Sequence, residues 1–169
     1  MTKTLYRCET KENYAKFRKE IEEKIKIHQL AGEIVPTPEM IKTPEQIAGI
    51  REACRINTLV LDEVTKRIKK GMTTEEIDRV VYSFTVAQGA IPAPLNFCGS
   101  INDQVCHGIP DKNVTLRSGD IVNVDVSTIY KGFYGDASRM FEIGRVDKRA
   151  RDLTAITKEC LKRGVAAAK

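Results

Sequence analysis

The sequence has no tryptophan, only two histidines and no uninterrupted apolar run of membrane-spanning length. Because a transmembrane helix needs about 20 consecutive apolar residues, a membrane protein is not expected. The first residues also lack the apolar core of a signal peptide, so we expect a cytoplasmic location. Five cysteines, an odd number without a C-x-x-C pair, indicate neither a disulfide framework nor a zinc motif. Reduced thiols are the expectation for such a protein.

A strong excess of one charge is also missing. The 28 basic and 23 acidic residues give a net charge of +5. The basic residues are spread along the chain and form no cluster interleaved with aromatic side chains, which a nucleic-acid-binding surface would need. DNA is therefore not an expected partner. A hydrophobic content of 41% in 169 residues instead indicates a globular domain of ordinary size.

The first forty residues read as a helical extension. Residues 10–30 predict an amphipathic helix whose apolar stripe consists of Tyr14, Phe17, Ile21 and Ile25. Gly32 stands where a left-handed cap ends a helix, and the prolines that follow favour an extended connector. We therefore divide the chain into an extension, residues 1–40, and a main body, residues 41–169.

The main body begins with two predicted helices. Thr43 and Gln46 predict a capping box at the first helix, with Pro44 in its first turn, and Gly71 ends it. Thr73 and Glu76 predict a second box for a helix that stops near Gly89. The expected buried stripes are Ile47, Ile50, Cys54, Leu61, Val64 and Ile68 in the first helix and Ile77, Val80, Val81 and Phe84 in the second. Cys54 is thus expected to fill the core.

Two further segments complete the expected elements. Residues 90–95 contain two prolines and can form neither a helix nor a central strand. Asp147 begins a last helix. Its expected inner side consists of Ala150, Leu153, Thr157, Cys160, Leu161 and Val165.

Residues 119–141 predict a β-hairpin. Valines alternate with Asn123, Asp125 and Ser127 in its first half, which is the period of a half-buried strand. A turn at residues 131–132 would pair Tyr130 with Phe133, so that residue numbers of paired positions sum to 263. Asp125 would then face Ser138, and Asp136 would face Ser127.

This register places Asp125 and Asp136 on one face, roughly 7–8 Å apart at the backbone. Two converging carboxylates repel each other unless a proton or a cation lies between them, and hard divalent metals prefer such oxygen ligands. Solvent-facing aspartates are the simpler alternative, and a bulge near Gly132 or Gly135 would separate the pair. His107 lies in a Gly- and Pro-flanked loop that leads into the hairpin and is a second candidate for a site residue.

Taken together, the segments at 42–47, 100–102, 106–110, 119–126 and 135–141 resemble the type I methionine aminopeptidases. The resemblance implies an α/β pita-bread fold with two pseudo-symmetric halves. It implies two divalent ions, of cobalt, manganese, iron or zinc, for which Asp125 and Asp136 are ligands. His107 would contact the substrate as a catalytic residue, and Cys98 would line the methionine pocket. The implied reaction removes the initiator methionine from nascent polypeptides with a small second residue.

Two departures from the family's pattern shape this expectation. The family's remaining ligands, a histidine and two glutamates, lie in a second half that this sequence lacks, so we expect the chain alone to be inactive. The segment before Cys98 is also shorter than in the family. The sequence is therefore expected to be an N-terminal half whose partner half lies in cis or in trans, or a degenerate relative. The ribosome is a further candidate partner.

Other function classes remain open at this point. Prolidases and aminopeptidase P share the fold but carry a longer, distinct N-terminal domain. A non-enzymatic pita-bread relative that binds protein or RNA is the main alternative, although such relatives are expected to lose the ligand aspartates.

Overall fold

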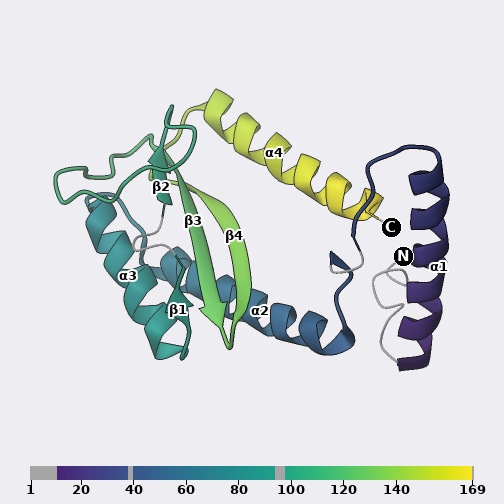
Figure 1. The fold of residues 1–169 in the computed structure, drawn as a ribbon. Coiled ribbons are helices and arrows are strands. Elements are labelled where there is room, and N and C mark those ends of the chain that lie inside the picture. The colour runs from purple at the N-terminus through teal and green to yellow at the C-terminus, as the bar shows by residue number, and fades with distance from the viewer. Residues whose placement is uncertain (1–10, 38–39, 94–97, 169) are drawn as a thin grey trace. The chain divides into compact units, whose positions relative to one another are not determined.

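The computed structural model describes residues 11–37, 40–93 and 98–168 (Figure 1). Gly49–Ala167 forms one compact unit, and the residues before it form another. The helices are α1 (Lys11–Leu30), α2 (Pro44–Arg67), α3 (Thr74–Ala87) and α4 (Lys148–Ala167), and the strands are β1 (Ile91–Pro92), β2 (Cys98–Ile101), β3 (Ile121–Tyr130) and β4 (Phe133–Glu142). None of the helices within these ranges is long and apolar enough to cross a membrane.

Helix α1 confirms the predicted N-terminal helix. Its stripe of Tyr14, Phe17, Ile21 and Ile25 is half-buried, whereas most of its other residues are exposed. Gly32 has a φ of 77° and donates a hydrogen bond to the Gln29 carbonyl, as a left-handed cap does. The division of the chain at residue 40 stays a prediction.

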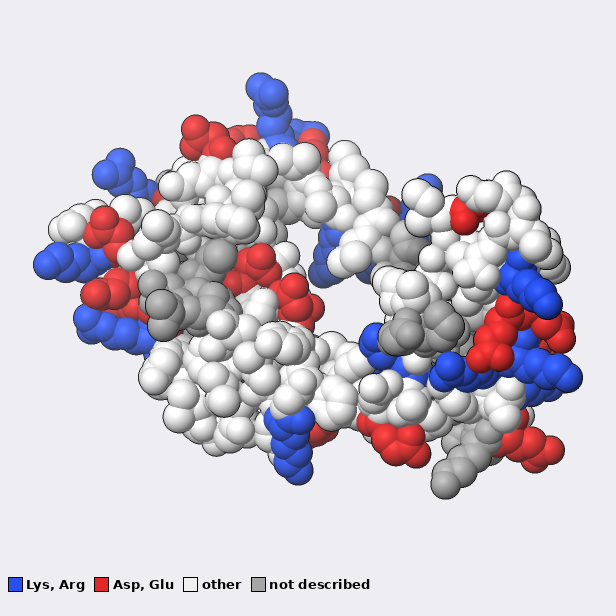
Figure 2. All heavy atoms as spheres, viewed as in Figure 1, with Lys and Arg blue, Asp and Glu red and all other residues white. Residues whose placement is uncertain are grey.

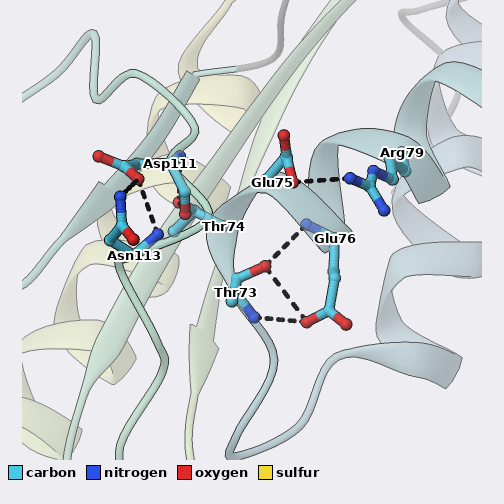
Figure 3. A network of polar contacts seen from close by, with 7 residues as sticks. All are labelled: Thr73, Thr74, Glu75, Glu76, Arg79, Asp111 and Asn113. Atoms are coloured by element: carbon cyan, nitrogen blue, oxygen red, sulfur yellow. Dashed lines mark hydrogen bonds and ion pairs between the residues drawn. The ribbon is translucent and has the colours of Figure 1, made fainter.

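Both predicted capping boxes are present. The Gln46 carboxamide accepts a hydrogen bond from the Thr43 backbone N–H at 2.8 Å, and the Thr43 hydroxyl accepts from the Gln46 backbone N–H. Thr73 and Glu76 make the same reciprocal pair at the start of α3 (Figure 3). Each box satisfies backbone donors that the helix itself leaves without a partner, which fixes where the helix begins.

The sheet is antiparallel and built around β3. Strands β1 and β2 pair with one edge of β3, and β4 pairs with the other edge. Strand β1 was not predicted: Ile91 and Pro92 form a two-residue edge strand opposite Ile129 and Thr128. Proline is tolerated there because the strand lies at the edge of the sheet, where its missing N–H breaks no ladder.

Helices α2 and α3 cover one face of this sheet, which we call the closed face (Figure 1). The core joins residues of both helices to the alternate residues of β3 and to β4. Its members include Val60, Leu61, Val64, Ile77, Val81, Val122, Val124, Val126 and Phe141. The opposite face, here the open face, carries Asp125, Ser127, Asp136 and Ser138 and remains accessible to solvent.

The prediction that Cys54 fills the core is wrong, because its side chain is exposed. Leu61 and Val64 of the predicted stripe are buried as expected, and the structure adds Ala53, Ile56, Asn57 and Val60 to the buried side of α2. Strand β4 approaches the helix backbone at Ala53: a Cβ at Gly135 would overlap the Ala53 carbonyl. The buried side of α2 at this point therefore carries Ala53 and not the neighbouring Cys54.

The expected inner side of α4 is also wrong. Asp147 caps the helix by accepting a hydrogen bond from the Ala150 N–H at 3.0 Å, as predicted. None of its residues is buried, however, and Leu153 and Leu161 are 58% and 68% exposed. No element of the described chain covers this apolar side.

The surface shown in Figure 2 has Lys and Arg interspersed with Asp and Glu. Several of these charges pair along helices, including Arg79 with Glu75 and Arg163 with Glu159. Such exposed pairs contribute little to stability, about 0.3–0.5 kcal/mol each, and are the arrangement of a solvated surface.

Candidate metal centre

The hairpin of β3 and β4 has the predicted register. Tyr130 pairs with Phe133, Asp125 with Ser138 and Ser127 with Asp136. Lys131 and Gly132 both have positive φ, 49° and 81°, which is the geometry of the tight turn that matches strand twist. No bulge interrupts the ten pairs of β3 and β4, so Asp125 and Asp136 lie on the same open face as diagonal neighbours.

The two aspartates have different surroundings. Asp125 is half-buried in the middle of β3, whereas Asp136 on β4 is exposed. The Ser127 hydroxyl donates a hydrogen bond of 2.8 Å to one carboxylate oxygen of Asp136. This bond occupies one oxygen and leaves the other one free of protein donors among the hydrogen bonds of the described chain. Ser127 therefore supports the Asp136 carboxylate. The predicted register placed Ser127 opposite Asp136 but did not predict this hydrogen bond.

The pKa of Asp125 reflects the negative charge of its neighbour Asp136. Burial raises the pKa of the Asp125 carboxyl, the nearby charge of Asp136 raises it further, and His107 lowers it. A raised carboxyl pKa means that the ionised form is disfavoured, and a cation between the carboxylates would remove that penalty. His107, which lies eighteen positions earlier in the sequence, thus acts on the Asp125 carboxyl in the opposite sense to Asp136.

The His107 loop is attached to β2 through its neighbour Gly108. The Gly99 N–H donates to the Gly108 carbonyl at 3.0 Å, and the Gly108 N–H donates to the buried Ser100 hydroxyl at 3.3 Å. A Cβ at Gly108 would overlap the Gly99 carbonyl oxygen, so only glycine permits this approach. His107 itself has a φ of 57°, in the left-handed region. Because β2 pairs with β3 at Asp125, the attachment brings the loop to the part of the sheet next to the aspartate pair.

A second attachment fixes the other end of the same loop. Thr74, the first residue of α3, donates from its hydroxyl to the Asp111 carbonyl at 3.0 Å and accepts from the Asp111 N–H at 2.8 Å. The Asp111 carboxylate in turn accepts two bonds from Asn113, as Figure 3 shows. Two anchors within a few residues hold the loop without regular secondary structure. Sequence reasoning missed the anchoring roles of Thr74, Ser100 and Asp111, because each role depends on a contact between separate segments and not on a local pattern.

Cys98 is the remaining predicted site residue. Its backbone pairs with Asp125 across β2 and β3, next to the aspartate pair. The shorter segment before it, which bears on the methionine pocket, lies outside the described residues.

The site is incomplete as a metal centre. Within residues 11–37, 40–93 and 98–168, no group of three or more His, Cys, Asp or Glu side chains could hold an ion. Two carboxylates can begin a divalent site, but six to eight oxygen ligands for Ca²⁺ or at least three protein ligands for a catalytic Zn²⁺ are typical. The two carboxylates fit part of a divalent-metal ligand set.

A polar pocket of about 380 Å³ lies away from the aspartate pair, where the end of β2 meets the start of β3. Asn102, at a φ of 55°, donates from its amide to Asp120 and accepts from the Ile121 N–H. Asp120 also accepts from the Arg117 N–H. These bonds fix the connection between two strands, and the polar groups satisfy one another.

Residues 48–169 match metallopeptidase family M24, and the chain belongs to that family. It is 48% identical to methionine aminopeptidase 1A of Arabidopsis thaliana over 136 residues, which are 76% of this chain and 34% of that protein. The predicted pita-bread fold is thereby confirmed for the part of the fold that this chain covers.

Solved structures agree with this assignment. Methionine aminopeptidase from Thermotoga maritima superposes with a TM-score of 0.74 at 33% identity, over 76% of this chain and 55% of that one. A prolidase from Pyrococcus horikoshii superposes with a TM-score of 0.68 but only 21% identity, which shows the shared fold alone. The chain thus spans about a third of the Arabidopsis relative and about half of the Thermotoga chain.

Proposed function

We propose that this chain carries the first part of the active site of a methionine aminopeptidase, which hydrolyses the initiator methionine from nascent polypeptides with a small second residue. The observation that carries the proposal is the convergence of Asp125 and Asp136 on the open face of one hairpin, beside the anchored His107 loop. The M24 assignment and the 48% identical methionine aminopeptidase support it. The non-enzymatic alternative fits less well, because such relatives are expected to lose the ligand aspartates and both are present here.

In this proposal Asp125 and Asp136 hold two divalent ions, drawn from cobalt, manganese, iron and zinc. Bound metal supplies Lewis acidity toward the scissile carbonyl and a water that ionises near neutral pH. Ser127 orients the carboxylate of Asp136 through the 2.8 Å hydrogen bond. His107 binds the backbone amide next to the scissile bond, and Cys98 forms part of the wall around the methionine side chain.

A second half completes the site. The described chain offers two carboxylates and no third ligand around them. The further ligands, among them a carboxylate that acts as the general base, are supplied by a segment joined in cis or bound in trans. Without them the chain is expected to bind metal weakly, because affinity follows the number of deprotonated ligands held in place.

Hydrolysis of a Met-Ala-Ser peptide tests this function. The 169-residue chain should show no turnover with Co²⁺, Mn²⁺ or Fe²⁺, whereas the same chain joined to the second half of the Arabidopsis relative should release methionine. Asp125→Ala in the joined protein should abolish release, and Asp103→Ala, which removes an exposed loop carboxylate, should leave it intact. Turnover by the 169-residue chain that disappears in Asp125→Ala would refute the half-site proposal.

A further inference from the structure

The position of the His107 imidazole depends on how its loop, residues 102–111, is held. No other described residue forms a hydrogen bond with this ring. The backbone of His107 has a φ of 57°, in the left-handed region. A residue with a Cβ is strained there and stays in that conformation only when the surrounding structure holds it. The anchors of the loop therefore decide where the imidazole lies.

Thr74 supplies the anchor at the downstream end of the loop. It is 2% exposed, and its hydroxyl donates to the Asp111 carbonyl at 3.0 Å and accepts from the Asp111 N–H at 2.8 Å (Figure 3). A threonine hydroxyl has one donor and two lone pairs, so one side chain can serve both backbone groups. The peptide groups on both sides of Asp111 are thus fixed, four residues after His107.

The Asp111 carboxylate cannot replace this anchor. It accepts two hydrogen bonds from Asn113, at 2.7 and 2.9 Å, and so closes a local turn without reaching the helix. Among the hydrogen bonds of the described residues, only those of the Thr74 hydroxyl join Asp111 directly to α3.

The start of α3 does not need the same hydroxyl. The N-cap of the helix is Thr73, and Thr74 follows it inside the first turn. The segment after the loop is also held independently, because Leu116 forms backbone hydrogen bonds with residues 71 and 72 at 2.9 and 2.8 Å. Loss of the Thr74 hydroxyl would therefore release Asp111 and leave the helix and the following segment attached.

The upstream anchor alone holds the loop less firmly. The Gly108 N–H lies 3.3 Å from the Ser100 hydroxyl, which is beyond the usual range of N–H···O bonds. Only two residues, Ile109 and Pro110, separate Gly108 from Asp111, and the proline ring restricts φ at the second of them. A displacement of Asp111 is therefore passed on to Gly108 and to the residue before it, His107.

We propose that Thr74 is a positioning residue for His107: its hydroxyl fixes Asp111 and thereby keeps the loop in the conformation that holds the imidazole next to the aspartate pair. The inference rests on the proposed function, in which His107 contacts the substrate. Thr74 itself touches neither substrate nor metal and acts through the loop.

Three variants separate positioning from packing. Thr74→Val keeps the branched shape of the side chain and removes the hydroxyl, and Thr74→Ser keeps the hydroxyl. Thr85→Val is the matched control, because Thr85 is buried on the same helix and its hydroxyl has no hydrogen-bond partner among the described residues. Circular dichroism should show the same helix content in all three variants and the wild type.

NMR of the metal-free 169-residue chain gives the first measurement, since backbone chemical shifts report the φ of His107. The wild type, Thr74→Ser and Thr85→Val should show left-handed values. Thr74→Val should show values averaged with the right-handed region. Left-handed shifts retained in Thr74→Val would overturn the proposal.

Turnover of a Met-Ala-Ser peptide by the chain joined to the second half of the Arabidopsis relative gives the second measurement. Thr74→Val should lower kcat roughly tenfold or more, because a small misplacement of a substrate-binding group is costly. It should keep its bound Mn²⁺, and Thr74→Ser should restore kcat. An unchanged kcat in Thr74→Val, an equal loss in Thr85→Val, or a loss of Mn²⁺ from Thr74→Val would each overturn the positioning role.

The two measurements distinguish this proposal from the proposed function. A joined wild type that releases no methionine would refute the proposed function, and the NMR shifts would still decide whether Thr74 sets the conformation of His107. Altered shifts with full turnover in Thr74→Val would do the reverse, because the reaction would then not need the loop in this conformation.

Discussion

Helices α2 and α4 carry apolar residues at the same helical spacing, yet Ile56 of α2 is 2% exposed and Ile156 of α4 is 62% exposed. The sheet repeats this contrast on its two faces. Val122 and Val124 on the closed face are fully buried, whereas Tyr134 on the open face is 62% exposed. The covered region contains the core of the unit, and the uncovered region contains both the aspartate pair and the exposed apolar side of α4. The candidate site thus lies on the open face of a sheet whose other face is packed.

The largest expected difference is in the free energy of unfolding, between alanine variants of Ile56 and Ile156. Ile56→Ala removes a buried side chain from the core and should lower the free energy of unfolding by about 2–5 kcal/mol. Ile156→Ala makes the same chemical change at an exposed position and should change it by less than about 0.5 kcal/mol. Urea unfolding of the 169-residue chain, followed by circular dichroism, measures both values.

The same pair of variants can break the comparison. If Ile156→Ala destabilised the chain as strongly as Ile56→Ala, α4 would be packed in solution. A dependence of that loss on protein concentration would then identify a second copy as the cover.

The sequence predicts the local features of this molecule better than its long-range contacts. The capping boxes at Thr43 and Thr73 and the hairpin register around Asp125 are local, and each was correct because neighbouring residues determine it. The position of Cys54 depends on how closely β4 approaches α2 at Gly135, a long-range contact that no short pattern contains. Periodicity also predicted an inner side for α4, and that prediction is wrong because none of the residues of this helix is buried.

In the candidate site, too, the local geometry was predictable and the long-range contacts were not. Parity and spacing placed Asp125 and Asp136 on one face, because a hairpin converts sequence offsets directly into geometry. The anchors of the His107 loop were not predictable in this way. Gly108 meets Gly99, and Asp111 meets Thr74, through contacts between segments whose relative placement only the folded chain defines.

A smaller effect is expected on the open face, where Asp125 should make the stability of the fold depend on pH. The pKa of Asp125 is raised in the folded state, so the folded chain holds this proton more tightly than the unfolded chain does. The contribution to stability is present below the ordinary aspartate pKa of about 3.9 and is lost as the pH rises through the raised value. Asp125→Asn should therefore gain stability relative to the wild type as the pH rises toward neutrality.

Urea unfolding of the metal-free chain between pH 3 and pH 7 would measure this difference. Asp103→Asn, which removes one negative charge from an exposed loop, is the matched control. A wild type that gains stability over Asp125→Asn across that range would contradict the assigned cause, which is burial next to Asp136.

Metal stoichiometry tests the central claim most directly. Equilibrium dialysis against Mn²⁺ should be run on the 169-residue chain and on the chain joined to the second half of the Arabidopsis relative. At a free concentration that loads the joined protein with two ions, the 169-residue chain should hold less than one, and Asp125→Asn/Asp136→Asn should empty the joined protein. Two tightly held ions in the 169-residue chain alone would contradict the account, because its own residues would then complete the site.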